Sequence, residues 1–233
     1  GEVCGERVMF DACFYINMDR SIQRRDRFLA AVAGVDDWPF PVPVRWPGVE
    51  EAAPPWWRTG DGAWGCFLAH FALYHHCIAR KIERPVIFED DAVFVEDFGE
   101  QVRNFLAAVP EDWHQIYFGG NHFTPPTVVN SAVLRCKGTN CNHAYALRGA
   151  GLSAIHELAG RFPGVLTDDN AHIDVMFNTL HVGGHLRSYA PWRWLVGQCA
   201  NVSERNGYVW TESNYWNIPE EALHKAAEEL AVC

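Results

Sequence analysis

The chain has 233 residues, of which 48% are hydrophobic, enough to build a sizeable core in one large α/β domain or two small ones. Its formal net charge of −10 argues against a general nucleic-acid-binding protein, because the phosphate backbone selects basic surfaces. No apolar run approaches the roughly 18 to 20 residues that span a bilayer, so we expect a soluble protein without a transmembrane segment. No linker divides the chain, and we expect a single domain over residues 1–233.

The first part of the chain predicts a strand, a helix and a long loop. Residues 8–16 are mostly apolar and aromatic, as in a strand, and a polar, basic segment with helical character follows to about residue 32. Residues 38–64 hold six of the 13 prolines and five of the ten tryptophans, a composition that disfavours a helix or a central strand. We expect a loop there, whose indole rings either pack over the core or stack on a sugar.

Helices and strands alternate through the central part. Between residues 65 and 82, a buried helix face is marked at helical spacing by Phe67, Phe71, Tyr74, Ile78 and Ile82. The further elements that the pattern predicts are a strand over residues 86–88, a helix over 98–109, a strand over 115–118 that ends at Gly119-Gly120, strands over 128–134 and 143–147, a helix over 149–158 and a terminal helix over 219–230. This alternation indicates an α/β sandwich with a mostly parallel sheet.

Three consecutive carboxylates follow the strand at residues 86–88. Val86, Ile87 and Phe88 are typical of a strand buried on both faces, and Glu89-Asp90-Asp91 then stand at its carboxyl end. Ligands bind at that edge in open α/β sheets, and adjacent carboxylates repel one another unless a cation or solvent relieves them. The motif is therefore either a site for a hard cation such as Mg²⁺ or Mn²⁺, or a solvated acidic loop.

The eight cysteines lack the paired spacing of zinc sites. Cys136 and Cys141 stand five apart and form either a local disulfide or a reduced loop pair, so cysteine usage leaves the compartment open. The N-terminus has no basic segment followed by an apolar signal core, and the C-terminus has no retention tetrapeptide. We expect a cytoplasmic protein, with the lumen of the secretory pathway as the alternative for a trimmed eukaryotic chain.

Several segments, in order, resemble glycosyltransferase family 25, the lipooligosaccharide and procollagen sugar transferases. The segments that carry the resemblance are Ile16-Asn17-Met18-Asp19-Arg20-Ser21, Gly65-Cys66-Phe67-Leu68-Ala69-His70, Val86-Ile87-Phe88-Glu89-Asp90-Asp91-Ala92, Ile116-Tyr117-Phe118-Gly119, Ala144-Tyr145-Ala146-Leu147, Ile173-Asp174, and Gln198 with Ser203. The resemblance runs from about residue 8 to about residue 206. It implies a GT-A type, Rossmann-like α/β/α sandwich that binds a nucleotide sugar in its first half, about residues 1–120, and the acceptor in its second half, about residues 121–233.

The resemblance also implies the residues of the donor site. Asp91, helped by Glu89, would hold Mn²⁺ or Mg²⁺, because departure of a nucleoside diphosphate needs a cation on its phosphate oxygens. The residues implied to contact the nucleotide sugar are Asn17, Asp19, Arg20, Glu89, Asp90, Gln198 and Ser203. A basic group that could help a metal hold a phosphate-bearing ligand follows the first strand: Arg20, Arg24, Arg25 and Arg27. Of these, we expect Arg25 and Arg27 to form a solvated helix face.

Transfers in the family create a β-linkage from an α-linked donor, so inversion is implied. Inversion needs a base on the acceptor hydroxyl, opposite the leaving diphosphate. Asp174 is the first choice because it stands where the Asp of the family's Pro-Val-Asp segment is expected, although His172-Ile173 replaces Pro-Val here. Asp168 and Asp169 compete for the role, or cap a helix that begins near residue 171.

The resemblance implies an inverting, divalent-metal-dependent transferase that moves a sugar, galactose first, from a UDP-sugar to a hydroxyl of a glycan, lipooligosaccharide or protein. We lean to bacterial lipopolysaccharide biosynthesis, with peripheral membrane association open. A non-catalytic sugar or nucleotide-sugar binding protein and a metal-dependent phosphoesterase stay as alternatives. A transferase that binds nucleotide without turnover also stays open, since Ala69 and His172-Ile173 depart from the family pattern.

Overall fold

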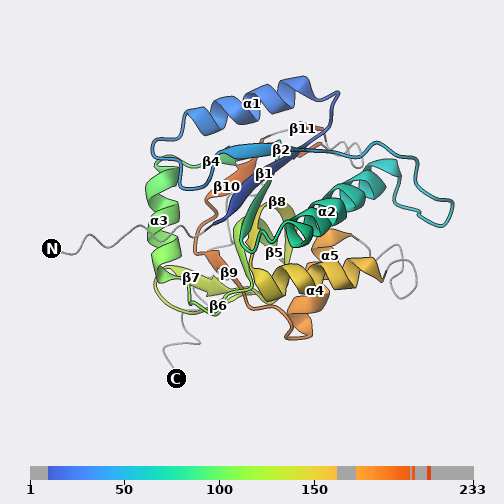
Figure 1. Cartoon of the computed structure of the whole chain (residues 1–233). Helices are drawn as coiled ribbons and strands as arrows, with labels where there is room; N and C mark the ends of the chain where they lie inside the picture. The colour runs from blue at the N-terminus through green and yellow to red at the C-terminus, as the bar shows by residue number, and fades with distance from the viewer. Residues whose placement is uncertain (1–9, 162–171, 200, 203–208, 211–233) are drawn as a thin grey trace.

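A twisted eight-stranded sheet runs through the centre of the molecule (Figure 1). The computed structural model describes residues 10–161, 172–199, 201–202 and 209–210. The strands of the sheet, in spatial order, are β2 (Pro43–Pro47), β1 (Ala12–Asn17), β3 (Pro85–Glu89), β8 (Thr139–Leu147), β5 (Gln115–His122), β9 (Ser188–Pro191), β7 (Val133–Arg135) and β6 (Thr127–Val128). Only β8 and β7 run opposite to the other six, so the predicted mostly parallel sheet is confirmed.

Helices cover both faces of this sheet and complete the predicted α/β/α sandwich (Figure 1). On one face lie α1 (Ile22–Ala33) and α3 (Phe98–Ala108), and on the other lie α2 (Asp61–Ala79), α4 (Gly149–Gly160) and α5 (Ile173–Val182). Two small antiparallel ribbons join β4 (Ala92–Phe94) to β10 (Val196–Gln198), and β11 (Asn201–Val202) to β12 (Val209–Trp210). None of the described helices has the length and hydropathy of a membrane span.

The strand before the acidic triplet is buried on both faces, as predicted. Val86 and Phe88 pack in the core beneath α1 and α3, whereas Ile87 packs on the opposite face against the core of α2. All three side chains are fully buried. Because alternate residues of a strand point to opposite faces, a continuous apolar run is what a central strand between two helical layers requires.

Three predictions about chain segments were wrong. The strand predicted over residues 128–134 is instead a hairpin of two short antiparallel strands, β6 and β7. Residues 38–64 do not form one long loop, because β2 lies within them as an edge strand that pairs with β1. Its prolines, Pro43 and Pro47, stand at its two ends, where an edge strand tolerates a missing amide donor. The strand predicted to end at Gly119-Gly120 continues to His122, because a register shift at Gly119 lets β5 pass through the glycines.

The helix predicted between residues 65 and 82 begins earlier, at Asp61, and its buried face is only partly as predicted. Phe67 and Tyr74 are buried, whereas Ile78 is 40% exposed and Cys77 is buried in its place. Two predicted features lie outside the described residues: the terminal helix over 219–230 and the helix cap at Asp168 and Asp169. Cys136 and Cys141 form no disulfide with each other, which favours the reduced loop pair of the two alternatives.

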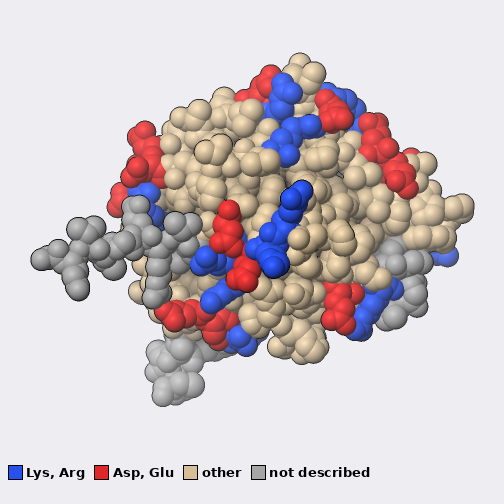
Figure 2. All heavy atoms as spheres, in the orientation of Figure 1, with Lys and Arg blue, Asp and Glu red and all other residues tan. Residues whose placement is uncertain are grey.

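Acidic and basic side chains are interspersed on the face that Figure 2 shows. On that face the excess of carboxylates therefore does not gather into a single acidic patch. Among the described residues, several charged side chains pair locally, for instance Arg84 with Asp11 at 3.0 Å and Arg187 with Asp112 at 2.9 Å. Exposed pairs of this kind contribute little to stability, about 0 to 1 kcal/mol each.

Helix α4 provides a test of the packing on the sheet. A Cβ on Gly151 would lie 2.4 Å from the carbonyl oxygen of His114, so Gly151→Ala should lower the free energy of unfolding by about 1 to 3 kcal/mol. Among the described residues, a Cβ on Gly160, in the same helix, would meet only the ring of Phe71 at 3.8 Å, so Gly160→Ala should be neutral or stabilise by up to about 1 kcal/mol. Urea denaturation measures both changes, and equal effects would contradict this packing.

Candidate functional site

A cavity of about 230 Å³ opens where β1 and β3 end. These two strands are parallel neighbours in which Ile16 lies opposite Glu89, so Asn17 and the acidic triplet meet at one edge of the sheet. The first turns of α2 and α5 and the end of β10 complete the wall. This is the edge at which open α/β sheets bind ligands.

Asn17 is buried and holds the end of β1 to three neighbouring segments. Its Nδ2 donates to Oδ2 of Asp90 at 2.6 Å and to the carbonyl oxygen of Ser21 at 3.0 Å. Its Oδ1 accepts a hydrogen bond of 2.9 Å from Nε of Arg45 on β2. The Asn17 amide therefore fixes the relative positions of β2, the start of α1 and the acidic triplet.

Asp90 uses both carboxylate oxygens inside the protein. Oδ2 accepts from Asn17, and Oδ1 accepts from Nε of Arg24 at 2.7 Å. Burial raises the pKa of Asp90, and the Arg24 guanidinium and the Asn17 amide partly offset that rise. With its oxygens taken by internal donors, Asp90 acts as an anchor between β3 and α1 rather than as an open ligand.

Asp91 turns toward β10. Nε2 of Gln198 lies 3.2 Å from both of its carboxylate oxygens, and Nη2 of Arg24 lies 3.2 Å from Oδ2. The pairing of β4 with β10 sets this contact, since Ala92 lies opposite Gln198 and the amide of Cys199 donates to the carbonyl oxygen of Asp91. Burial raises the pKa of Asp91 to about 7, and the nearby Glu89 carboxylate adds to the rise.

Glu89 faces the helical layer of α2. Its Oε1 lies 3.6 Å from Nε2 of the buried His70. Burial raises the pKa of Glu89, but the hydrogen bond and charge of His70, with His143 and Arg24, outweigh it and lower the pKa overall. Glu89 and Asp91 thus form a pair of cavity-lining carboxylates, of which Asp91 is the less compensated, and this donor set fits a divalent cation with oxygen ligands.

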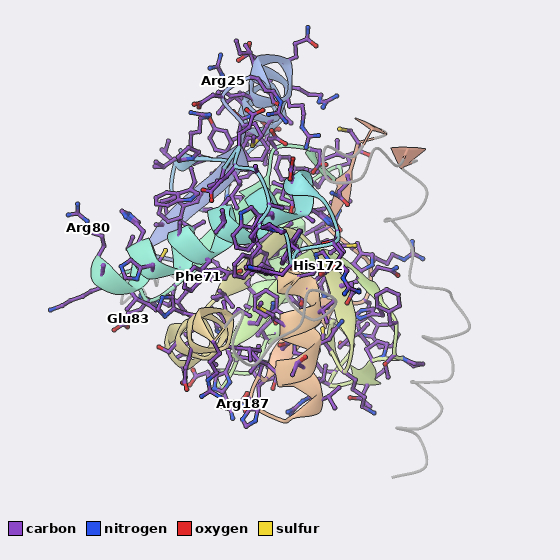
Figure 3. The ribbon with its side chains drawn as sticks, turned by 90° about the vertical axis from the view of Figure 1, so that its right-hand side faces the viewer. Arg25, Phe71, Arg80, Glu83, His172 and Arg187 are labelled. Atoms are coloured by element: carbon purple, nitrogen blue, oxygen red, sulfur yellow. The ribbon has the colours of Figure 1, made fainter. Side chains whose placement is uncertain are left out.

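Asp174 lines the same cavity from the first turn of α5. Its Oδ1 accepts the backbone amide of Val175 at 3.0 Å, which fixes the carboxylate at the start of the helix. The preceding His172 makes an edge-to-face contact with Trp57, with ring centroids 5.6 Å apart, and Figure 3 shows it near the segment that leads into α2. Part of the tryptophan-rich segment therefore packs against the wall of the cavity.

The cavity gathers most of the residues predicted for the site. They are Asn17, Arg20, Glu89, Asp90, Asp91, Asp174 and Gln198. Asp19 does not line it, because its side chain is 86% exposed and pairs with Arg45. Asp169 and Ser203 lie outside the described residues.

Arg45 takes part in the site and Cys66 lines it, although the sequence reasoning assigned them no role there. Arg24 also takes part in the site, and it belongs to the basic group that the sequence reasoning offered for a phosphate-bearing ligand. No sequence signal pointed to Arg45, because its contact with Asn17 depends on the register of β2 against β1.

The model of glycosyltransferase family 25, described as an LPS biosynthesis protein, matches residues 58–135. That range holds α2, β3 and the acidic triplet. The predicted resemblance to glycosyltransferase family 25 is confirmed.

Named relatives within glycosyltransferase family 25 agree with this match. "Inactive glycosyltransferase 25 family member 3" of Homo sapiens is 30% identical over 138 residues, which is 51% of this chain and 23% of that protein. "Procollagen galactosyltransferase 2" of Mus musculus is 26% identical over 214 residues, 79% of this chain and 33% of that protein. The chain therefore spans about a third or less of the length of these relatives.

Among solved structures, A197 from STIV matches with a TM-score of 0.44 and 11% identity, over 86% of this chain and 94% of that one. A glycosyltransferase involved in glycosylation of the major capsid of PBCV-1 matches with a TM-score of 0.37 and 10% identity, over 69% of this chain and 73% of that one. No conclusion about activity follows from likeness at this level.

Arg24 provides a test of the charge balance at the site. Its side chain is 17% exposed and that of Asp90 is 6% exposed, so Arg24→Gln should lower the free energy of unfolding by about 3 kcal/mol, the low end for a broken buried pair. The neighbouring Arg25 is 39% exposed and pairs only with Asp26 among the contacts described; Figure 3 shows it at the outer edge of the molecule. Arg25→Gln should leave stability within about 0.5 kcal/mol.

The pH dependence of this loss follows from the carboxylates. In Arg24→Gln, the pKa of Asp90 rises further in the folded state. At neutral pH the folded variant therefore carries the full free-energy cost of a buried, ionised Asp90 without its cation. As the pH falls toward the ordinary aspartate value of about 3.9, protonation removes the penalty and the two proteins should converge in stability. Urea denaturation across this pH range measures the difference, and a constant gap would contradict the assigned contact.

Proposed function

We propose that this domain transfers a sugar, galactose first, from a UDP-sugar to a hydroxyl of a glycan or protein acceptor, with inversion and with Mn²⁺ or Mg²⁺. The observation that carries the proposal is the convergence of Glu89, Asp91 and Asp174 on one cavity at the carboxyl edge of β1 and β3. The names of the matched procollagen galactosyltransferases support galactose as the sugar and a protein hydroxyl as one acceptor.

The two cavity-lining carboxylates suit the diphosphate of the donor only together with a cation. A bound Mn²⁺ or Mg²⁺ would supply the positive charge that neutralises the departing diphosphate. Asp91 is oriented for this role by Gln198 and Arg24, and Glu89 is the second ligand. Asn17 and Asp90 act one step away, because their hydrogen bonds hold the ends of the strands in place.

Asp174 approaches the cavity from a different element, the first turn of α5. A carboxylate there can accept the proton of an acceptor hydroxyl as that hydroxyl attacks the sugar, while the diphosphate leaves on the side of Asp91. Attack and departure on opposite sides invert the anomeric centre. The competing base, Asp169, stays a prediction that mutation can separate from Asp174.

A second candidate function is nucleotide-sugar binding without turnover. Ala69 stands in the cavity wall where the family pattern has a serine, and one matched relative is named an inactive member of the family. The two functions share donor binding and differ in transfer. A screen of UDP-sugars for hydrolysis and transfer, with and without Mn²⁺, distinguishes them.

The metal role of Asp91 predicts a coupling between Mn²⁺ and UDP. Mn²⁺ should raise the affinity for UDP in the wild type, and Asp91→Asn should remove most of that gain, at least the roughly 10- to 100-fold that loss of an outer-shell partner costs. Isothermal titration with and without Mn²⁺ measures it. Asp26→Asn, an exposed carboxylate on α1, is the matched control and should keep the full gain. Metal-independent UDP binding in the wild type would refute the assignment.

The base role of Asp174 predicts a loss of rate rather than of binding. Asp174→Asn should slow transfer by roughly 10²- to 10⁴-fold, the usual contribution of a general base, and leave UDP affinity with Mn²⁺ unchanged. Initial rates with the donor identified by the screen measure the first effect, and NMR of the product gives the anomeric configuration. Should Asp169→Asn instead abolish transfer while Asp174→Asn does not, the base is Asp169.

A further inference from the structure

A sulfur, an imidazole and a carboxylate converge on the floor of the cavity, on the α2 side of the acidic triplet. Cys66 and His70 are four residues apart on α2, so their side chains share one face of the helix. Glu89 reaches the same point from the end of β3. One ligand atom from each of the three residues lies within 4.8 Å of the other two.

The position of the His70 ring decides which nitrogen faces this point. Nδ1 lies 2.9 Å from the hydroxyl of Tyr145, which in turn lies 2.7 Å from the hydroxyl of Tyr74. Burial raises the pKa of both phenols well above their ordinary value, so the two hydroxyls are neutral. This buried chain holds the imidazole in one orientation, with Nε2 directed at Oε1 of Glu89, 3.6 Å away.

That orientation is the one used by histidines that bind metals. Such a histidine engages its second ring nitrogen in a hydrogen bond that fixes the tautomer and the direction of the first. Without a cation, an Nε2–H of His70 faces the Glu89 carboxylate and helps to lower its pKa. In the other tautomer, Nδ1–H donates to Tyr145 and the lone pair of Nε2 is available to a cation bound beside Glu89. The sulfur of Cys66 supplies a third electron-pair donor beside the same point.

We propose that Cys66, His70 and Glu89 form a site for a borderline-soft divalent cation of the Zn²⁺ class. Tetrahedral zinc with bonds of about 2.0 to 2.3 Å places its ligand atoms roughly 3.3 to 3.8 Å apart. The distance between His70 Nε2 and Glu89 Oε1 already falls in this range, and Cys66 Sγ needs to move by no more than about 1 Å. All three residues line the cavity, so a fourth position opens toward it.

The sulfur separates this site from the oxygen site proposed at Asp91. Mn²⁺ and Mg²⁺ select oxygen ligands, whereas a thiolate and an imidazole select Zn²⁺ or Co²⁺. On binding, the Cys66 thiol loses its proton to solvent and the S–metal bond forms, so affinity rises with pH. Glu89 belongs to both ligand sets. If the proposed function holds, Zn²⁺ therefore competes with the cation that supports donor binding.

The site is tested with Co²⁺ and no nucleotide, so that its outcome is independent of the proposed transferase activity. Protein freed of metal with a chelator is titrated with Co²⁺, and a near-ultraviolet thiolate-to-cobalt band should appear and then vanish when Zn²⁺ is added. Cys66→Ser should abolish the band. Cys199→Ser, at a second cysteine of the same cavity, should keep it. Absence of the band in the wild type, or its persistence in Cys66→Ser, overturns the proposal.

A second measurement needs no variant. Cys66 is partly exposed in the cavity, so iodoacetamide should label it, and one equivalent of Zn²⁺ should slow that labelling at least tenfold as measured by peptide mass spectrometry. Cys141 and Cys199, which line the same cavity, should be labelled at an unchanged rate. Equal protection of all three cysteines, or none at Cys66, overturns the proposal even if Cys66→Ser fails to fold.

Discussion

The structure of the site depends on the compensation of one buried carboxylate. Asp90 is 5% exposed, and an ionised carboxylate in such a place is tolerated only when donors replace the lost water. Asn17 and Arg24 provide those donors from the end of β1 and from α1. The same two side chains make further contacts around the cavity. Asn17 also accepts a hydrogen bond from Arg45, and Arg24 also forms an ion pair with Asp91. One electrostatic requirement thus fixes two strand ends and a helix around the cavity.

This requirement divides three adjacent acids into different roles. Alternation along the chain sends Asp90 toward α1, while Glu89 faces α2 and Asp91 faces β10. The positive charge nearest to the triplet, on Arg24, is paired mainly with Asp90. Burial, and next the nearby Glu89 carboxylate, raise the pKa of Asp91, whereas His70, His143 and Arg24 lower the pKa of Glu89 despite its burial. The carboxylate of the triplet that is least compensated in its ionised form, Asp91, therefore lies at the cavity wall.

How far the sequence predicted this arrangement depends on the range of each interaction. The run from Val86 to Phe88 predicted a doubly covered strand, because burial on both faces is encoded in consecutive residues. The family resemblance, rather than a local pattern, assigned Asn17 and Gln198 to the site, and both line the cavity. The prediction that Asp19 contacts the nucleotide sugar is not supported by its position. Asp19 lies past the end of β1, and its side chain turns outward and pairs with Arg45. Arg45 itself acts through strand register, which leaves no local pattern. Cys66 and His70 have helical spacing, but their third partner comes from another layer.

The two predicted halves of the chain are interleaved in the sheet itself. Strand β8, from the second half, lies between β3 and β5 of the first half and pairs with both. Tyr145 on β8 forms a hydrogen bond with His70, so the second half also orients a side chain beside Glu89 in the cavity. Asp174 enters through α5, which packs on β8. A donor site and an acceptor site in this fold would share one wall, and a change in the packing of β8 would alter both.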